Sequence, residues 1–215
     1  MTARPPGSLD PERVRGNLER VHERIATAGG DPTAIEVCAA TKYVAAADLP
    51  ALAEAGIRLV GENRAQDLLA KQDLHGDLFE WDFIGTLQSR KVRDIAPAVR
   101  LIHSVATESA LRKLESHPAT AVLLQVNVAA EEGKGGIAPD ELPRYLEASP
   151  VAIAGLMTMP PPTADPETSR PHFARLASLA ADNDLEQLSM GTTQDFEAAV
   201  AEGATIVRLG SVLYG

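Results

Sequence analysis

The sequence is poor in cysteine and in basic residues, and it has no long apolar run. Its 215 residues include one cysteine, Cys38, so no internal disulfide can form and a reducing compartment is expected. No stretch approaches the roughly 20 apolar residues that span a bilayer, and the first residues lack the apolar core of a signal peptide. The 30 acidic and 20 basic residues give a formal charge of −10, which disfavours binding to nucleic acid or to an anionic membrane. We therefore expect a cytoplasmic protein.

Several motifs of common enzyme classes are also missing. His103 has no second histidine or cysteine at the spacing of a metal site, so we expect no bound metal. No Ser-His-Asp arrangement or nucleophile elbow can be picked out of the sequence. The glycine-rich segment 133–136 lacks the spacing and the Lys-Ser/Thr end of a P-loop, and we interpret it as a mobile loop.

The sequence does contain a regular alternation of apolar runs and helical segments. Residues 1–9 are expected to form a flexible arm, and Asp10 and Pro11 to begin a helix. Short apolar runs then recur near residues 35–40, 59–60, 81–84, 101–103, 121–128, 151–156, 185–188 and 206–209. Eight strands alternating with helices in residues 10–215 predict a single (β/α)8 TIM barrel with an extra N-terminal helix. A doubly wound open sheet is the alternative, but Gly-x-Gly-x-x-Gly does not follow the first run.

Lys42 ends the first apolar run, in the region where barrels of this type collect their chemistry. By strand alternation it shares a face with the small residues Ala40 and Cys38, and with Glu36, which we expect at the open bottom of the barrel. The lysine is either a solvated loop residue or an amine partly removed from water that can attack a carbonyl.

Two stretches near the C-terminus are candidates for a phosphate site. Residues 189–193 precede a predicted helix, residues 209–211 contain a second glycine turn, and barrels often bind phosphate at these two loops. A helix cap or an ordinary turn would explain either stretch alone. Arg208 lies within an apolar run and needs a partner, which is an acid such as Glu62, a ligand, or both.

Six stretches, in order, resemble the pyridoxal phosphate homeostasis proteins, single-barrel relatives of the N-terminal domain of alanine racemase. They are Ala39–Lys42, Gly61–Asn63, Trp81–Gln88, Gly155–Met157, Ser189–Gly191 and Val207–Gly210, and the match runs from about residue 35 to the end. The resemblance implies that Lys42 binds pyridoxal 5′-phosphate covalently as an aldimine. It implies a phosphate site at Thr193, Gly210 and Ser211, and it places Arg208 opposite the pyridine nitrogen, where it weakens the ring as an electron sink. The implied cofactor-binding residues are Lys42, Asn63, Met157, Ser189, Gly191, Thr193, Arg208, Gly210 and Ser211.

The sequence departs from the family pattern at four places. Thr192–Thr193 replaces Met-Ser, which keeps a hydroxyl at the second position. Asp82 replaces a common histidine, Gly135 replaces a bulkier residue, and Gln194 stands where an acid is usual. The last three changes are expected to alter loop mobility or release of the cofactor.

The resemblance implies a monomeric, non-catalytic protein without catalytic residues. It would hold pyridoxal phosphate in vitamin B6 homeostasis and deliver it to apo-enzymes that depend on the cofactor. One alternative is an amino-acid racemase, which needs a base on each face of its substrate. The alanine racemases supply one base from a second domain, for which we expect no room here, and Tyr43, Tyr145 and Tyr214 are not evident substitutes. A Schiff-base aldolase without cofactor is another alternative, but it would not need a phosphate site beside Arg208.

Overall fold

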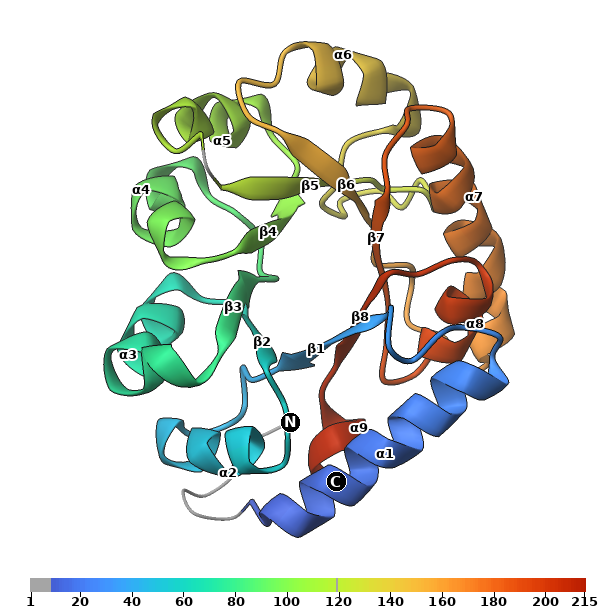
Figure 1. The fold of residues 1–215 in the computed structure, drawn as a ribbon. Coiled ribbons are helices and arrows are strands. Elements are labelled where there is room, and N and C mark those ends of the chain that lie inside the picture. The colour runs from blue at the N-terminus through green and yellow to red at the C-terminus, as the bar shows by residue number, and fades with distance from the viewer. Residues whose placement is uncertain (1–8, 119) are drawn as a thin grey trace.

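The structure is a computed structural model that describes residues 9–118 and 120–215, and these residues form a closed barrel of eight parallel strands (Figure 1). Consecutive strands are neighbours, and the last pairs with the first. The strands are β1 (Glu36–Ala40), β2 (Leu59–Glu62), β3 (Glu80–Phe83), β4 (Leu101–Val105), β5 (Ala121–Gln125), β6 (Ile153–Met157), β7 (Gln187–Thr192) and β8 (Ile206–Leu209). The predicted TIM barrel is confirmed, and the open-sheet alternative is wrong.

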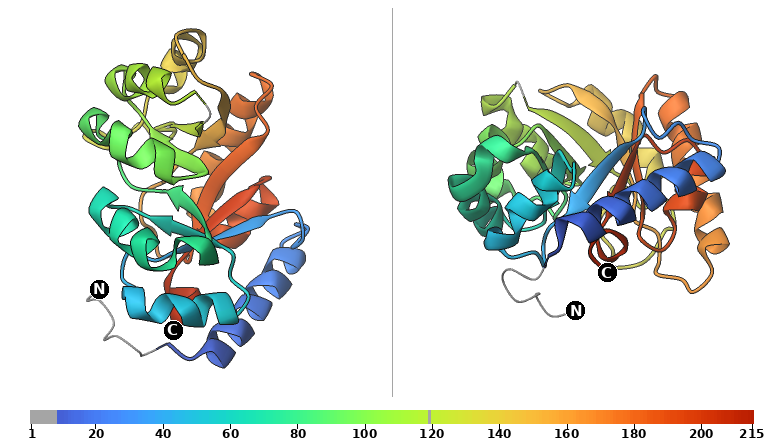
Figure 2. Two further views of the ribbon diagram at one scale, coloured as in Figure 1. Left: turned by 60° about the vertical axis from the view of Figure 1, so that its left-hand side comes forward. Right: turned by 60° about the horizontal axis from the view of Figure 1, so that its bottom comes forward.

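Helices cover the outside of the barrel, as Figures 1 and 2 show. No helix in the described part of the chain is long and apolar enough to cross a membrane. The helices are α1 (Pro11–Thr27), α2 (Leu49–Glu54), α3 (Ala65–His75), α4 (Val92–Ile95), α5 (Glu108–Lys113), α6 (Leu142–Glu147), α7 (Arg170–Ala181), α8 (Phe196–Ala201) and α9 (Ser211–Tyr214).

Helix α1 begins as the sequence predicts and closes the ring of helices between α2 and α8. The side chain of Asp10 accepts from the N–H of Glu12, and Pro11 occupies the first turn. Because α9 has only four residues, α1 covers this part of the barrel and packs beside α9. The buried Asn17 donates to the carbonyl of Leu213 (2.9 Å), which ties the two helices together.

The barrel interior contains one small apolar layer with charged groups at its lower end. Glu36 begins β1 and binds Arg100, which precedes β4, so the expected place of Glu36 at the open bottom is confirmed. Residues 1–8 of the expected N-terminal arm lie outside the described residues, whereas Leu9 is buried. The apolar layer consists of Cys38, Leu59, Leu101, Leu123, Met157 and Ile206.

Candidate functional site

Lys42 lies two residues beyond β1, at the end of the barrel where the carboxyl ends of the strands meet. The N–H of Thr41 donates to the carbonyl of Gly61 (3.0 Å), so the chain stays joined to β2 up to the residue before the lysine. The Lys42 side chain is exposed, and its Nζ lies 5.0 Å from the ring centroid of Tyr43. Of the two alternatives for Lys42, the structure shows the solvated side chain, because the chain leaves the barrel wall here and Tyr43 itself is 41% exposed.

A buried ion pair lies directly behind the lysine. Lys71 of α3 forms an ion pair with Glu62 at the end of β2, and its Nζ also donates to the carbonyl of Thr41 (2.8 Å). The hydroxyl of Thr41 donates to the same carboxylate (2.7 Å). Both contacts are to Oε1 of Glu62, and its Oε2 has no hydrogen-bond partner among the described residues. No ion pair joins Glu62 to Arg208, whose guanidinium binds Ser189 and Thr158 instead, so the interpretation of Glu62 as the partner of Arg208 is wrong. The contacts of Lys71 and Thr41 hold the backbone from which Lys42 projects.

Arg208 points from β8 into the barrel and binds neutral acceptors. Its Nη1 donates to the hydroxyl of Ser189 on β7, and its Nη2 donates to the carbonyl of Thr158, which follows β6 (2.9 Å). Burial lowers the pKa of Arg208 to about 10, so the guanidinium stays charged at pH 7. A guanidinium has five N–H donors. The described residues provide acceptors for two of them, so Arg208 has donors left for a ligand.

Beneath Arg208 a chain of hydrogen bonds runs down the barrel interior. His103 Nδ1 is 2.7 Å from the hydroxyl of Ser189, and its Nε2 is 3.0 Å from Asp82 Oδ2. Arg100 binds both carboxylate oxygens of Asp82 (3.1 and 2.8 Å) and then Glu36 at the bottom. This arrangement of Ser189, His103 and Asp82 was not predicted from the sequence, in which His103 was considered only as a metal ligand. A strand-by-strand alternation of inward positions could have indicated it.

The charged groups in this series of hydrogen bonds are balanced by their neighbours. Burial alone would raise the pKa of Asp82, but hydrogen bonds from His103 and Arg100 hold it below its ordinary value. Burial lowers the pKa of His103, and the hydrogen bond to Asp82 offsets this only in part. His103 is therefore a neutral imidazole at pH 7. All side chains from Ser189 to Asp82 are closed to solvent, so Ser189 is not an accessible nucleophile.

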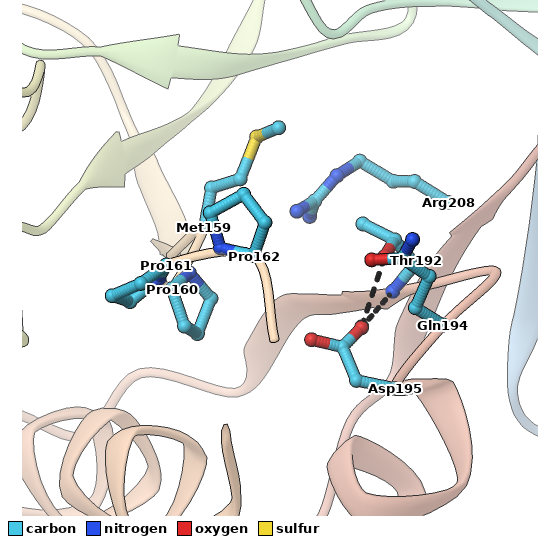
Figure 3. Close-up of a pocket in the computed structure, with 9 residues that line it drawn as sticks. Met159, Pro160, Pro161, Pro162, Thr192, Gln194, Asp195 and Arg208 are labelled. Carbon is cyan, nitrogen blue, oxygen red and sulfur yellow. Dashed lines mark hydrogen bonds between the residues drawn. The ribbon is translucent and has the colours of Figure 1, made fainter. Parts of the chain in front are cut away.

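Above Arg208 of β8 the barrel opens into a cleft between the loop that follows β6 and the end of β7 with the loop after it. Figure 3 shows Arg208 pointing across this cleft toward Met159 and the loop of three prolines. Asp195 accepts from the N–H and the hydroxyl of Thr192 (2.7 and 3.0 Å), which fixes the loop after β7. Gln194 lines the cleft, so this departure from the family pattern lies at the site. The remaining lining residues are Pro160, Pro161, Pro162 and Gly191.

The two C-terminal stretches meet, as the phosphate hypothesis requires. Thr193 Oγ1 accepts from the N–H of Gly210 (3.1 Å), which joins the loop after β7 to the loop after β8. Ser211 begins α9 beside them. Gly191 has a separate structural reason: its φ is +89°, and an added Cβ would lie 2.8 Å from the backbone of Phe196 on α8. Packing against α8 therefore explains why this position is a glycine, although Gly191 also lines the cleft.

The other predicted residues lie on the barrel wall near these groups. Asn63 follows β2, next to the end of β1, and its buried Oδ1 has no hydrogen-bond partner among the described residues. Met157 is buried at the end of β6, in register with Ser189 of β7. The structure thus brings Ser189 together with Arg208 and Thr193 with Gly210. Among the described residues, no hydrogen bond or ion pair joins Lys42 to these four residues.

Fold and cleft together define a (β/α)8-barrel protein with a polar cleft at the carboxyl ends of its strands. The family model described as "Alanine racemase, N-terminal domain" matches residues 9–215. A pyridoxal phosphate homeostasis protein from Aquifex aeolicus is 38% identical over 95% of this chain and 96% of its own length. A homeostasis protein from Pseudomonas aeruginosa is 41% identical over 95% of this chain and 94% of its own length.

A solved structure of a similar protein shows that the similarity extends to the fold. PipY from Synechococcus elongatus, solved with pyridoxal phosphate bound, is 32% identical and superimposes with a TM-score of 0.77. The alignment covers 91% of this chain and all of PipY. The chain belongs to the family of pyridoxal phosphate homeostasis proteins, within the wider group of alanine racemase N-terminal domains.

Proposed function

We propose that this protein binds pyridoxal 5′-phosphate reversibly at the upper end of the barrel and takes part in intracellular vitamin B6 homeostasis. Lys42 would hold the aldehyde covalently, and the cofactor would remain available for transfer to apo-enzymes. The observation that carries the proposal is the buried Arg208, whose unused donors face a cleft at the end of the barrel that also bears Lys42. The relatives named as homeostasis proteins, and PipY with its bound pyridoxal phosphate, support it.

The residues present fit each part of the cofactor. Unpaired donors on a buried guanidinium suit the ring nitrogen, which is an acceptor when unprotonated. The unpartnered Oδ1 of Asn63 is a polar atom that a ligand group can satisfy. The hydroxyl of Thr193 and the turn at Gly210 and Ser211 suit a phosphate, since Gly210 has no side chain to keep a ligand from the backbone. When bound, the cofactor supplies an electrophilic aldehyde and, with an unprotonated ring nitrogen, only a weak electron sink.

The surroundings of Lys42 support holding rather than turnover. Racemisation needs a second base on the far face of the substrate. Tyr145 lies buried in α6 and Tyr214 buried in α9, while Tyr43 packs against Lys42 itself. An arginine opposite the ring nitrogen also disfavours the carbanion chemistry that such catalysis needs.

The proposal is tested by titrating the purified protein with pyridoxal phosphate and following the visible absorption of the cofactor. We expect the band to shift on binding, and borohydride reduction followed by peptide mass spectrometry to place the label on Lys42. The Lys42→Ala variant should lose the label, whereas Lys113→Ala, which removes an exposed lysine of α5, should keep it.

Three outcomes would contradict the proposal. Labelling of other lysines with Lys42 unmodified, or no spectral change, would refute the binding site. Robust racemisation of alanine or another amino acid by the loaded protein would refute the non-catalytic role while leaving the site intact.

A further inference from the structure

The hydrogen bonds beneath Arg208 have a fixed direction. Asp82 is ionised and can only accept, so the Nε2 of the neutral His103 must carry the proton. His103 Nδ1 is then an acceptor, and the hydroxyl of Ser189 must donate to it. With its proton directed at His103, Ser189 presents a lone pair to Arg208. The donor or acceptor role of each group therefore fixes the role of the next group along the hydrogen bonds.

The opposite direction would leave a buried donor of Ser189 unsatisfied. If Nδ1 of His103 carried a proton, Ser189 would accept from it with one lone pair and from Arg208 with the other, and its own proton would have no acceptor among the described residues. Ser189, His103 and Asp82 are each 0% exposed, so bulk water does not reach the group to accept that proton, and this direction is disfavoured. The orientation of the hydroxyl that binds Arg208 is thus set by Asp82, the third residue along the hydrogen-bond chain from Arg208.

We propose that Asp82, His103 and Ser189 are positioning residues that hold Arg208 as a hydrogen-bond donor toward the ring nitrogen of its ligand. This inference rests on the proposed function. Its consequence is selectivity: the protein should prefer a pyridine ring over a benzene ring of the same shape. A site built to pair with a polar atom rejects a ligand that lacks that atom, because its own buried polar group is left unpaired. Asp82 stands where the resemblance to the family implies a histidine, so its carboxylate in this arrangement is a feature of this chain's own sequence.

The first test needs no ligand. Nitrogen-15 NMR of the histidine side chains at pH 7 should show His103 as a neutral imidazole protonated at Nε2. In Asp82→Asn the amide can either accept or donate, so the imidazole should become a mixture of the two neutral forms. A protonated imidazole, or an Nδ1–H form in the unmodified protein, would overturn the proposal whether or not the protein binds pyridoxal phosphate.

The second test compares two ligands, pyridoxal phosphate and its analogue in which a C–H replaces the ring nitrogen. The unmodified protein should bind pyridoxal phosphate about tenfold more tightly than the analogue, the factor given by one hydrogen bond to a charged group. This preference should fall several-fold in Ser189→Ala and Asp82→Asn, and Ser189→Thr, which keeps the hydroxyl, should restore it.

Ser104→Ala provides the matched control. Ser104 is equally buried, and its hydroxyl donates to the carbonyl of Gly85, away from Arg208. A general loss of packing would weaken the binding of both ligands alike and leave the ratio of their affinities unchanged. An unchanged ratio in Ser189→Ala, with pyridoxal phosphate still bound, would refute the positioning role and leave the proposed function standing. Absence of binding by the unmodified protein would refute both.

Discussion

Replacing Lys71 by methionine should destabilise the protein strongly, because it leaves the carboxylate of Glu62 buried without a counter-charge. Glu62 is fully buried, and Lys71 is its only cationic partner among the described residues. Removing one member of a buried ion pair costs about 3–5 kcal/mol. In a protein of this size each kcal/mol lowers Tm by about 2–4 °C, so Lys71→Met should lower Tm by about 6–20 °C.

The double variant Lys71→Met/Glu62→Gln separates the buried charge from the lost packing. A neutral amide keeps the hydrogen bond from Thr41 and removes the uncompensated charge, so the double variant should recover more than half of the loss. The assay is urea unfolding followed by circular dichroism. Arg112→Met is the control, because Arg112 and Glu108 form an exposed pair worth about 0.5 kcal/mol or less.

Two results would refute this reasoning. One is a loss below about 1 kcal/mol in Lys71→Met, the range of an exposed pair. The other is a double variant less stable than the single one, which would mean that Glu62 is not an uncompensated charge. Since Lys71 also holds the carbonyl of Thr41, we expect Lys71→Met to weaken binding at Lys42 as well.

Three further predictions concern pH, the thiol and two glycines. Because the pKa of His103 is lowered in the folded protein, the unfolded chain binds a proton below about pH 6.5 that the native protein does not bind. The free energy of unfolding should therefore decrease as the pH decreases below this value, by up to about 1.4 kcal/mol per pH unit. His103→Gln should reduce this pH dependence in unfolding measured at pH 7 and pH 5. Burial raises the pKa of Cys38, so a disulfide reagent should label it only after unfolding, and rapid native labelling would contradict the buried position. Gly85→Ala would place a Cβ 2.0 Å from the carbonyl oxygen of Asn63 and should lower Tm markedly, whereas Gly76→Ala meets no atom and should leave Tm unchanged or higher.

The sequence predicts the order of elements well, because each apolar run is bounded by glycine, proline or a helix cap. It is less successful where the ends of strands depend on neighbours. The run 121–128 reads as one strand, but β5 ends at Gln125 and Val126 bridges Ile137 instead. Strand β7 extends to Thr192 through a register shift against β8, so Ser189 lies in a strand rather than in a loop. Helix α9 is too short to show any periodicity.

The candidate site likewise has features that the sequence predicts and features that depend on distant neighbours. Lys42, Thr193 and Gly210 are recognisable because each follows a strand, and the ends of parallel strands converge in a barrel. Arg208 is recognisable as a charged residue within an apolar run, one residue before the end of β8. The choice between an exposed and a partly buried Lys42 could not be made from the sequence, because it depends on where the chain leaves the barrel wall. The partners of Arg208 could not be predicted either, since they come from strands far apart in the sequence and are set by strand register.

Asp82 shows how a departure from a family pattern is explained by a distant partner. By its position alone, a carboxylate inside the barrel is costly unless it is paired. The structure pairs it twice, with Arg100 at the lower side and His103 at the upper side. Glu36 and Asp82 thereby balance Arg100 and Arg208, and the imidazole between them stays neutral. A histidine at position 82 would remove one negative charge from this set. Arg100→Met would instead remove the positive charge that pairs with Glu36 and Asp82, so it should destabilise this protein unless Asp82 is changed to a neutral residue at the same time.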